Sequence, residues 1–200
     1  MTQFEPRADV EHVMTGELSQ PLIWVDLEMT GLDPDTEVIV EIAVIITDGD
    51  LAVLHEGPDL VIHADDAVLS RMHSRVKTMH KKSGLTAQIR ASETTVAHAE
   101  KEVLDFVRQH VPAVATAPLA GNSVHADRAF LRKYMPTLEA HCHYRNVDVS
   151  TIKELARRWY PDAVDGAPAK DGGHRALADI RESIAELQYY RRTIFAAEPQ

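Results

Sequence analysis

Three groups of residues in this sequence have the types and spacing that could bind metal ions. Asp26 and Glu28 stand two residues apart at the end of an apolar segment. Because side chains alternate along a strand, both carboxylates would face the same side. Asp127 follows a second apolar segment, and His174 and Asp179 follow a pair of glycines near the end of the chain. Taken singly, each group is also typical of a strand end or a helix start that faces solvent.

Taken together, these residues predict hydrolysis assisted by metal ions. Carboxylate oxygens are the ligands that Mg²⁺ and Mn²⁺ prefer, and four carboxylates can hold two such ions roughly 3.5–4 Å apart. A histidine has an unperturbed pKa near ~6.5, so it can take a proton from an attacking water molecule at neutral pH. The cations would also neutralise a bound phosphate, which an acidic site would otherwise repel.

The first third of the chain is expected to form an antiparallel meander. Residues 22–27 are apolar and β-rich, and residues 38–47 form the nearly continuous β-branched run of a buried central strand. A turn signal at residues 48–50 leads to an expected strand at 51–55, and Gly57 with Pro58 is expected to break the chain before another at 60–63. The meander would therefore have three or four strands.

The pattern then alternates between helices and strands. Ser150 is expected to cap one helix, and the last helix carries an apolar stripe. The expected helices are residues 94–111, 124–134, 150–159 and 174–196, the expected strands are 118–122 and 145–149, and residues 161–173 are expected to be a loop. Hairpins followed by this alternation predict one α/β domain around a mixed sheet. Its bounds would be residues 21–197, after a flexible leader of residues 1–20.

The composition of the chain limits the classes of protein to which it can belong. The formal net charge is −10, but residues 1–66 hold 16 acidic residues and one basic residue, whereas residues 67–134 hold 11 basic and five acidic residues. A negative chain without an extended basic track should bind long nucleic acid poorly. The single cysteine, Cys142, excludes an intrachain disulfide framework and favours a reducing cytoplasm. Neither a membrane span nor a signal peptide is expected.

The order Asp-x-Glu, Asp, His-x4-Asp resembles the DEDDh exonucleases, which have a ribonuclease H-like fold. Longer segments resemble the oligoribonuclease family within that group, and the resemblance runs from about residue 22 to residue 190. The segments that carry it are residues 22–34, 121–123, 133–136, 143–145, 148–151, 153–159 and 179–183.

The resemblance implies a mixed five-stranded sheet with helices on both faces and a defined activity. The protein would hydrolyse very short RNA, chiefly dinucleotides, in the 3′-to-5′ direction and release nucleoside 5′-monophosphates. His174 would be the general base. Two divalent cations, Mg²⁺ or Mn²⁺, would be held by Asp26, Glu28, Asp127 and Asp179.

The resemblance also implies substrate contacts and a partner. Leu32 would lie against a base as an apolar wedge, and a cap on the 5′ phosphate would restrict substrate length, since Ser and Lys bind phosphate by hydrogen bonds and charge. The protein would be a homodimer in which one segment reaches the neighbouring protomer's site. The cap residues would be Ser123, Ser150 and Lys153, and the reaching segment would be His143, Tyr144 and Arg145.

Three alternatives remain open from the sequence. The first is another DEDDh exonuclease of the proofreading or transfer-RNA trimming type, which would have the same metal site but lack the cap segments. The second is a non-catalytic nucleotide-binding module, which the intact set of four acids and a histidine disfavours. The third is a zinc site at residues 141–143, which lacks the second pair of ligands that structural zinc requires.

Overall fold

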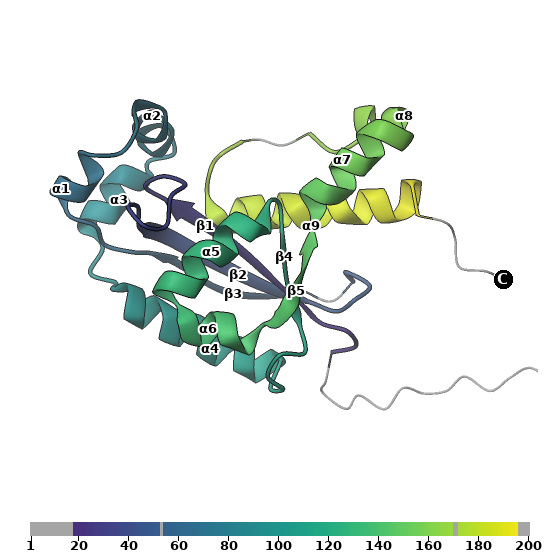
Figure 1. The fold of residues 1–200 in the computed structure, drawn as a ribbon, viewed down its shortest axis with the longest axis horizontal. Coiled ribbons are helices and arrows are strands. Elements are labelled where there is room, and N and C mark those ends of the chain that lie inside the picture. Colours follow the sequence, from purple (N-terminus) through teal and green to yellow (C-terminus); the bar gives the residue numbers. More distant parts are fainter. Residues whose placement is uncertain (1–17, 53, 170–171, 196–200) are drawn as a thin grey trace, which may run out of the picture.

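A mixed five-stranded sheet forms the centre of the protein, as the computed structural model shows for residues 18–52, 54–169 and 172–195 (Figure 1). Its strands are β1 (Leu22–Met29), β2 (Ile39–Thr47), β3 (Leu54–Val61), β4 (Pro118–Gly121) and β5 (His143–Asp148). Their order is β3-β2-β1-β4-β5. The first three strands pair antiparallel, whereas β4 runs parallel to both β1 and β5. This sheet confirms the predicted α/β fold.

Helices cover both faces of the sheet (Figure 1). One face packs against α4, α5 and α6, and the other packs against α7 and α9. The short helices α1 to α3 pack around a third apolar cluster at one end of β2. The helices are α1 (Asp66–Leu69), α2 (Ser74–Lys82), α3 (Leu85–Ala91), α4 (Val96–His110), α5 (Val124–Tyr134), α6 (Pro136–His141), α7 (Val149–Trp159), α8 (Pro161–Asp165) and α9 (Ala176–Thr193).

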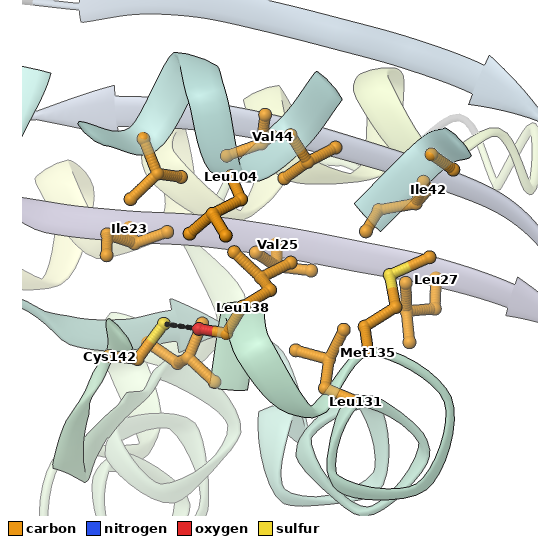
Figure 2. Close-up of a cluster of buried hydrophobic side chains, with 14 of the residues drawn as sticks. Ile23, Val25, Leu27, Ile42, Val44, Leu104, Leu131, Met135, Leu138 and Cys142 are labelled. Carbon is orange, nitrogen blue, oxygen red and sulfur yellow. Dashed lines mark hydrogen bonds between the residues drawn. The ribbon is translucent and has the colours of Figure 1, made fainter. Parts of the chain in front are cut away.

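The alternation of side chains along β1 sends its apolar and acidic residues to opposite faces. Ile23, Val25 and Leu27 enter the core beneath α4, α5 and α6, where Figure 2 shows them packed among the helix side chains. Asp26 and Glu28 therefore point toward the face that carries α9, as the two-residue spacing predicted. The burial of such aliphatic side chains, at roughly 1.5–3 kcal/mol for each one that is fully buried, fixes the strand on which the acids stand.

The prediction that Gly57 and Pro58 break the chain was wrong, because both residues lie inside β3. The pairing of β2 with β3 shifts register between Ala43 and Ile45, opposite this pair. Proline is tolerated at an irregularity in an edge strand, since no ladder hydrogen bond is lost there. A Cβ atom at position 57 would stand 2.4 Å from the Phe106 ring, so only glycine fits. The meander consequently has three strands.

Other boundaries also differ from expectation. The side chain of Asp148, rather than that of Ser150, accepts the N-terminal hydrogen bond of α7, from the Ser150 N–H. The last helix begins at Ala176 instead of residue 174, and α8 occupies part of the expected loop because Pro161 is well placed at the first position of a helix. Most of the expected leader, residues 1–17, lies outside the described residues.

Among the helices of the described residues, none combines the length and apolar character that crossing a membrane requires.

Candidate active site

The end of β1 presents two carboxylates in the middle of the sheet. Glu28 is 6% exposed and Asp26 is half-buried. Since β1 lies between β2 and β4, the carboxylates cannot turn away into solvent at a sheet edge. The first expected pair of ligands is therefore held on a rigid, central strand.

Helix α5 brings Asp127 to the same place. Asp127 is 6% exposed, and its Oδ1 accepts a hydrogen bond of 3.0 Å from the Leu27 N–H of β1. The connection from β4 to α5 is tight: Ser123 has φ 53°, and a Cβ atom on Gly121 would stand 3.1 Å from the Val25 carbonyl oxygen. Glycine lets β4 and β1 approach, and the turn then aims the first turn of α5 at the carboxylates.

The start of α9 supplies Asp179 and His174. Glu28, His174 and Asp179 each offer one ligand atom, and these three atoms lie within 4.8 Å of one another. Among the described residues, they form a possible metal site. His174 is exposed and precedes the helix with φ 49°, in the left-handed region that a residue with a side chain rarely adopts. This strained conformation at a candidate catalytic residue agrees with a functional role.

Burial and mutual repulsion raise the pKa of the carboxyl groups. Burial, with repulsion from Asp127 and Asp179, raises the pKa of Asp26 well above its usual value. Burial and repulsion from Asp179 raise the pKa of Glu28 to about 8. Burial raises the pKa of Asp127 to about 7, although the hydrogen bond from Leu27 acts in the opposite direction. Clustered carboxylates of this kind are stable in ionised form only beside compensating positive charge.

A cavity of about 220 Å³ lies beside these groups, and Asp26, His174, Asp179 and Asn122 are among the residues that line it. The cavity thus joins the acidic cluster to the segment that follows β4.

The three expected cap residues also lie together. Ser123 Oγ lies 3.2 Å from Ser150 Oγ, and Ser150 Oγ donates to Asn122 Oδ1 at 3.0 Å. Lys153 Nζ donates to Glu186 Oε1 at 2.9 Å, and Asn122 Nδ2 lies 3.4 Å from the other oxygen of Glu186. The network therefore runs without interruption from the cap residues to the wall of the acidic cavity.

Two other expected contacts lie on the surface. Leu32 is 83% exposed in the turn after β1, where its side chain is available to a ligand. His143, Tyr144 and Arg145 begin β5, an edge strand, and Tyr144 is 71% exposed. Strand geometry puts His143 about 16 Å before Asp148, the end of β5 that adjoins the cap residues. Within one chain, residues 143–145 are therefore not gathered with the acidic cluster.

Sequence reasoning missed Glu41, which holds the start of α9. Glu41 is fully buried in β2, and its carboxylate accepts hydrogen bonds from Arg175 at 2.9 Å and from the Ala176 N–H at 3.3 Å. A negative charge at a helix N-terminus is favourable, and here it comes from the sheet. An acid in the middle of an apolar strand was a signal in the sequence, since such a residue needs a partner.

His80 and Glu186 were missed as well. His80 is fully buried, with Nε2 2.9 Å from the Met29 carbonyl oxygen and Nδ1 3.7 Å from Glu28 Oε2. Burial lowers the pKa of His80. Glu186 shares the inner side of α9 with Asp179, seven residues earlier, and this spacing of two helical turns was readable in advance. For His80 the sequence offered no comparable signal.

Comparison with known proteins supports the assignment that the fold and the cluster suggest. The exonuclease family model RNase_T matches residues 23–187. The oligoribonuclease of Nocardia farcinica (strain IFM 10152) is 56% identical over 178 residues, which cover 89% of this chain and 82% of the relative. The oligoribonuclease of Rhodococcus jostii (strain RHA1) is 54% identical over 182 residues, which cover 91% and 92% respectively.

Solved structures share the fold at lower sequence identity. Exonuclease I from Methylocaldum szegediense superposes with a TM-score of 0.64 at 20% identity, over 87% of this chain and 41% of that one. The zinc-bound complex of E. coli exonuclease I with single-stranded DNA superposes with a TM-score of 0.67 at 16% identity, over 88% of this chain and 41% of that one. The chain thus spans about two fifths of these structures, and at such identities the likeness concerns the fold.

The sheet order, the helices on both faces and the family match define an exonuclease of ribonuclease H-like fold, a nuclease that hydrolyses phosphodiester bonds. Within this class, the chain belongs to the oligoribonuclease family.

Proposed function

We propose that this protein hydrolyses very short RNA, chiefly dinucleotides, from the 3′ end and releases nucleoside 5′-monophosphates. The observation that carries the proposal is that carboxylates from β1, α5 and α9 lie close together beside a cavity that Asn122 also lines, and that Asn122 is hydrogen-bonded to Ser150 of the expected cap. The first feature suits phosphodiester hydrolysis, and the second would limit the length of the substrate.

The donor set fits two divalent cations, Mg²⁺ or Mn²⁺. Hard oxygen ligands dominate it, and burial raises the pKa of Glu28 and of Asp127, an effect that a bound cation would oppose. When bound, such cations neutralise the negative charge of a phosphodiester and make water a better nucleophile. Asp26, Glu28, Asp127 and Asp179 would hold them.

His174 would take the proton from the attacking water. It is exposed at the mouth of the cavity, next to Glu28 and Asp179, so its imidazole can reach water on the open side. Its left-handed backbone directs the side chain before α9 begins, and the pairing of Glu41 with Arg175 fixes the following residue. The leaving group is the 3′ oxygen of the preceding nucleoside, which receives a proton as the bond to phosphorus breaks.

The cap would hold the 5′ phosphate of the substrate. Ser123 and Ser150 supply hydroxyl groups, and Lys153 supplies an ammonium group that Glu186 holds in place. A phosphate bound there and a second phosphate at the acidic cluster would leave room for two nucleotides. Leu32 would lie against a base.

A second copy of the chain would complete the cap. His143, Tyr144 and Arg145 lie on the open edge of the sheet, where Tyr144 and Arg145 are exposed. Arg145 lies 5.4 Å from the centroid of the Tyr144 ring, and its charge would be available to a phosphate. Because these residues are not gathered with their own acidic cluster, we assign them to the site of a neighbouring protomer in a homodimer. The single, buried cysteine agrees with a reducing cytoplasm as the location.

The test uses RNAs of two, five and about 20 nucleotides in Mg²⁺, each labelled at the 5′ end. We expect the dinucleotide to disappear fastest and to yield mononucleotides, and EDTA to abolish the reaction until Mg²⁺ or Mn²⁺ is restored. Equal rates on the longest RNA would instead favour the second candidate, an exonuclease of the proofreading or transfer-RNA trimming type. Activity that is insensitive to EDTA would contradict the role of the carboxylates.

A further inference from the structure

A carboxylate lies among the residues that would form the cap. Asp148 ends β5 and precedes α7, and its Oδ1 accepts hydrogen bonds from the Ser123 N–H at 3.0 Å and from the Ser150 N–H at 2.9 Å. The hydroxyl oxygens of the same two serines lie 3.2 Å apart. A phosphate that reached these hydroxyl groups would therefore lie close to the Asp148 carboxylate, and the two anions would repel each other.

The lysine of the cap already has an acidic partner of its own. Lys153 Nζ lies 2.9 Å from Glu186 Oε1, so its charge is shared with that carboxylate. In the described part of the chain, the basic side chain that pairs with Asp148 is His125, whose Nδ1 lies 3.6 Å from Asp148 Oδ2. His125 is therefore the described side chain placed to donate to an anion that binds beside Asp148.

The His125 ring is accessible to a ligand. It stands in the first turn of α5, two residues after Ser123, and its side chain is 75% exposed, whereas that of Asp148 is 17% exposed. The distance of 3.6 Å between them is too long for a hydrogen bond, so Asp148 does not hold the ring nitrogens. An imidazole carries at least one N–H group in either protonation state, so His125 can donate to an anion in both.

We propose that His125 binds the 5′ phosphate of the substrate beside Ser123, Ser150 and Lys153, and thereby determines how strongly the protein prefers 5′-phosphorylated dinucleotides. This inference rests on the proposed function, in which the cap receives that phosphate. The imidazole N–H donates a hydrogen bond to a phosphate oxygen, and this contact offsets the repulsion from Asp148. A dinucleotide with a 5′ hydroxyl group has no phosphate to accept the bond, so it gains no affinity from His125.

The experiment measures kcat/KM in Mg²⁺ for two dinucleotides that differ only in a 5′-phosphate or a 5′-hydroxyl end. The wild-type protein should prefer the 5′-phosphate form. In His125→Ala, the ratio of kcat/KM for the 5′-phosphate form to that for the 5′-hydroxyl form should fall about tenfold, as the loss of a hydrogen bond to a charged group implies. In His125→Gln, which keeps an N–H donor, the ratio should fall by less than about threefold.

His98→Ala is the matched control. His98 is also an exposed histidine beside a carboxylate, with Nε2 2.8 Å from Glu102 Oε1, but it stands on α4, which packs chiefly against β2, β3 and α6. Its substitution should leave the ratio within about twofold of the wild-type value. A wild-type preference for the 5′-phosphate form that His125→Ala leaves unchanged would overturn the proposal. Equal kcat/KM values for the two forms in the wild-type protein would count against the phosphate cap itself, and failure to cleave either form would count against the proposed function.

Discussion

His174 differs from the four acids around it because it is exposed and belongs to neither a helix nor a strand. It lies close enough to Glu28 and Asp179 to act either as a metal ligand or as the general base. A metal ligand affects both turnover and cation affinity, whereas a general base affects turnover alone, so substitution of His174 can distinguish the two roles.

His174→Ala should lower kcat by about 10²- to 10⁴-fold, the usual contribution of a general base, and leave Mn²⁺ affinity and thermal stability nearly unchanged. Asp179→Asn should lower both kcat and Mn²⁺ affinity, because it removes a ligand oxygen charge. Single-turnover kinetics and calorimetric Mn²⁺ titration measure these quantities. If His174→Ala weakens Mn²⁺ binding as much as Asp179→Asn does, His174 is a ligand and not the base.

The raised pKa of Glu28 predicts how the cation-free protein responds to pH. The folded pKa of about 8 lies above the usual value near 4.5, so the folded state binds an extra proton between these limits. In EDTA, the free energy of unfolding should therefore fall as pH rises from about 5 to 8, by about 1 kcal/mol per pH unit for this group. Thermal melts between about pH 5 and pH 8 would show this loss of stability as a falling melting temperature. Glu28→Gln should make the melting temperature less dependent on pH, and a melting temperature that rises with pH in the parent protein would refute the prediction.

Cys142 stands directly before residues 143–145, but its thiol is not placed to form a disulfide between two protomers. The thiol is instead buried in the core, where Sγ donates to the Leu138 carbonyl oxygen at 3.3 Å (Figure 2). Burial raises the pKa of Cys142 to about 12, which leaves almost no thiolate to react.

At the level of elements, α9 is held to the sheet by two different ion pairs. Glu41 in β2 pairs with Arg175 in a largely buried position, whereas Glu56 in β3 pairs with Arg181 in solvent. Only the first pair adjoins His174. Substitutions in the two ion pairs can therefore be compared: the Glu41–Arg175 pair would position the site, whereas the Glu56–Arg181 pair lies on the surface away from it.

Glu41→Gln should reduce the free energy of unfolding by about 2–3 kcal/mol, because it leaves Arg175 partly buried without its charged hydrogen-bond partner. It should also lower kcat more than it raises KM, since the His174 segment loses its anchor. Glu56→Gln should lower the free energy of unfolding by less than about 1 kcal/mol and leave kcat unchanged. Chemical denaturation measures the free energy of unfolding, and steady-state kinetics on the dinucleotide measure kcat and KM. Equal effects of the two substitutions would mean that Glu41 is not a positioning residue.

Strongly patterned elements could be predicted from the sequence, whereas contacts between distant residues could not. The β-branched run predicted β2, and residues 124–134 predicted α5 with its observed bounds. The carboxylates of the site were predictable because an acidic side chain at the end of an apolar segment is at risk of burial, and a buried carboxylate requires a compensating partner. The partnership of Glu41 with Arg175 spans 134 positions and depends on how α9 packs across β2, which local spacing does not encode.

At the level of the whole molecule, the proposed homodimer would form at the open edge of β5. A dimer there would give each site a catalytic cluster from one protomer and residues 143–145 from the other. Heterodimers of two inactive variants test this arrangement directly.

Arg145→Ala and His174→Ala should each be nearly inactive alone. Mixed dimers should contain one intact site, with His174 from the first protein and Arg145 from the second. Random exchange would restore about one quarter of the wild-type activity per protomer, since half of the dimers are mixed and half of their sites are intact. The measurement is dinucleotide turnover after subunit exchange, with native mass spectrometry to count mixed dimers. Mixed dimers without recovered activity would show that Arg145 acts within its own chain.

The buried pairing of Glu41 with Arg175 also sets a limit on engineering this protein. An apolar pair of similar volume in place of a buried ion pair is often neutral or stabilising, so a design that optimised heat resistance alone would choose it. Such a variant would keep the sheet and the helix together but change the contacts next to His174, whose backbone is in the left-handed region. Selection for thermostability and selection for turnover would therefore favour different residues at these two positions.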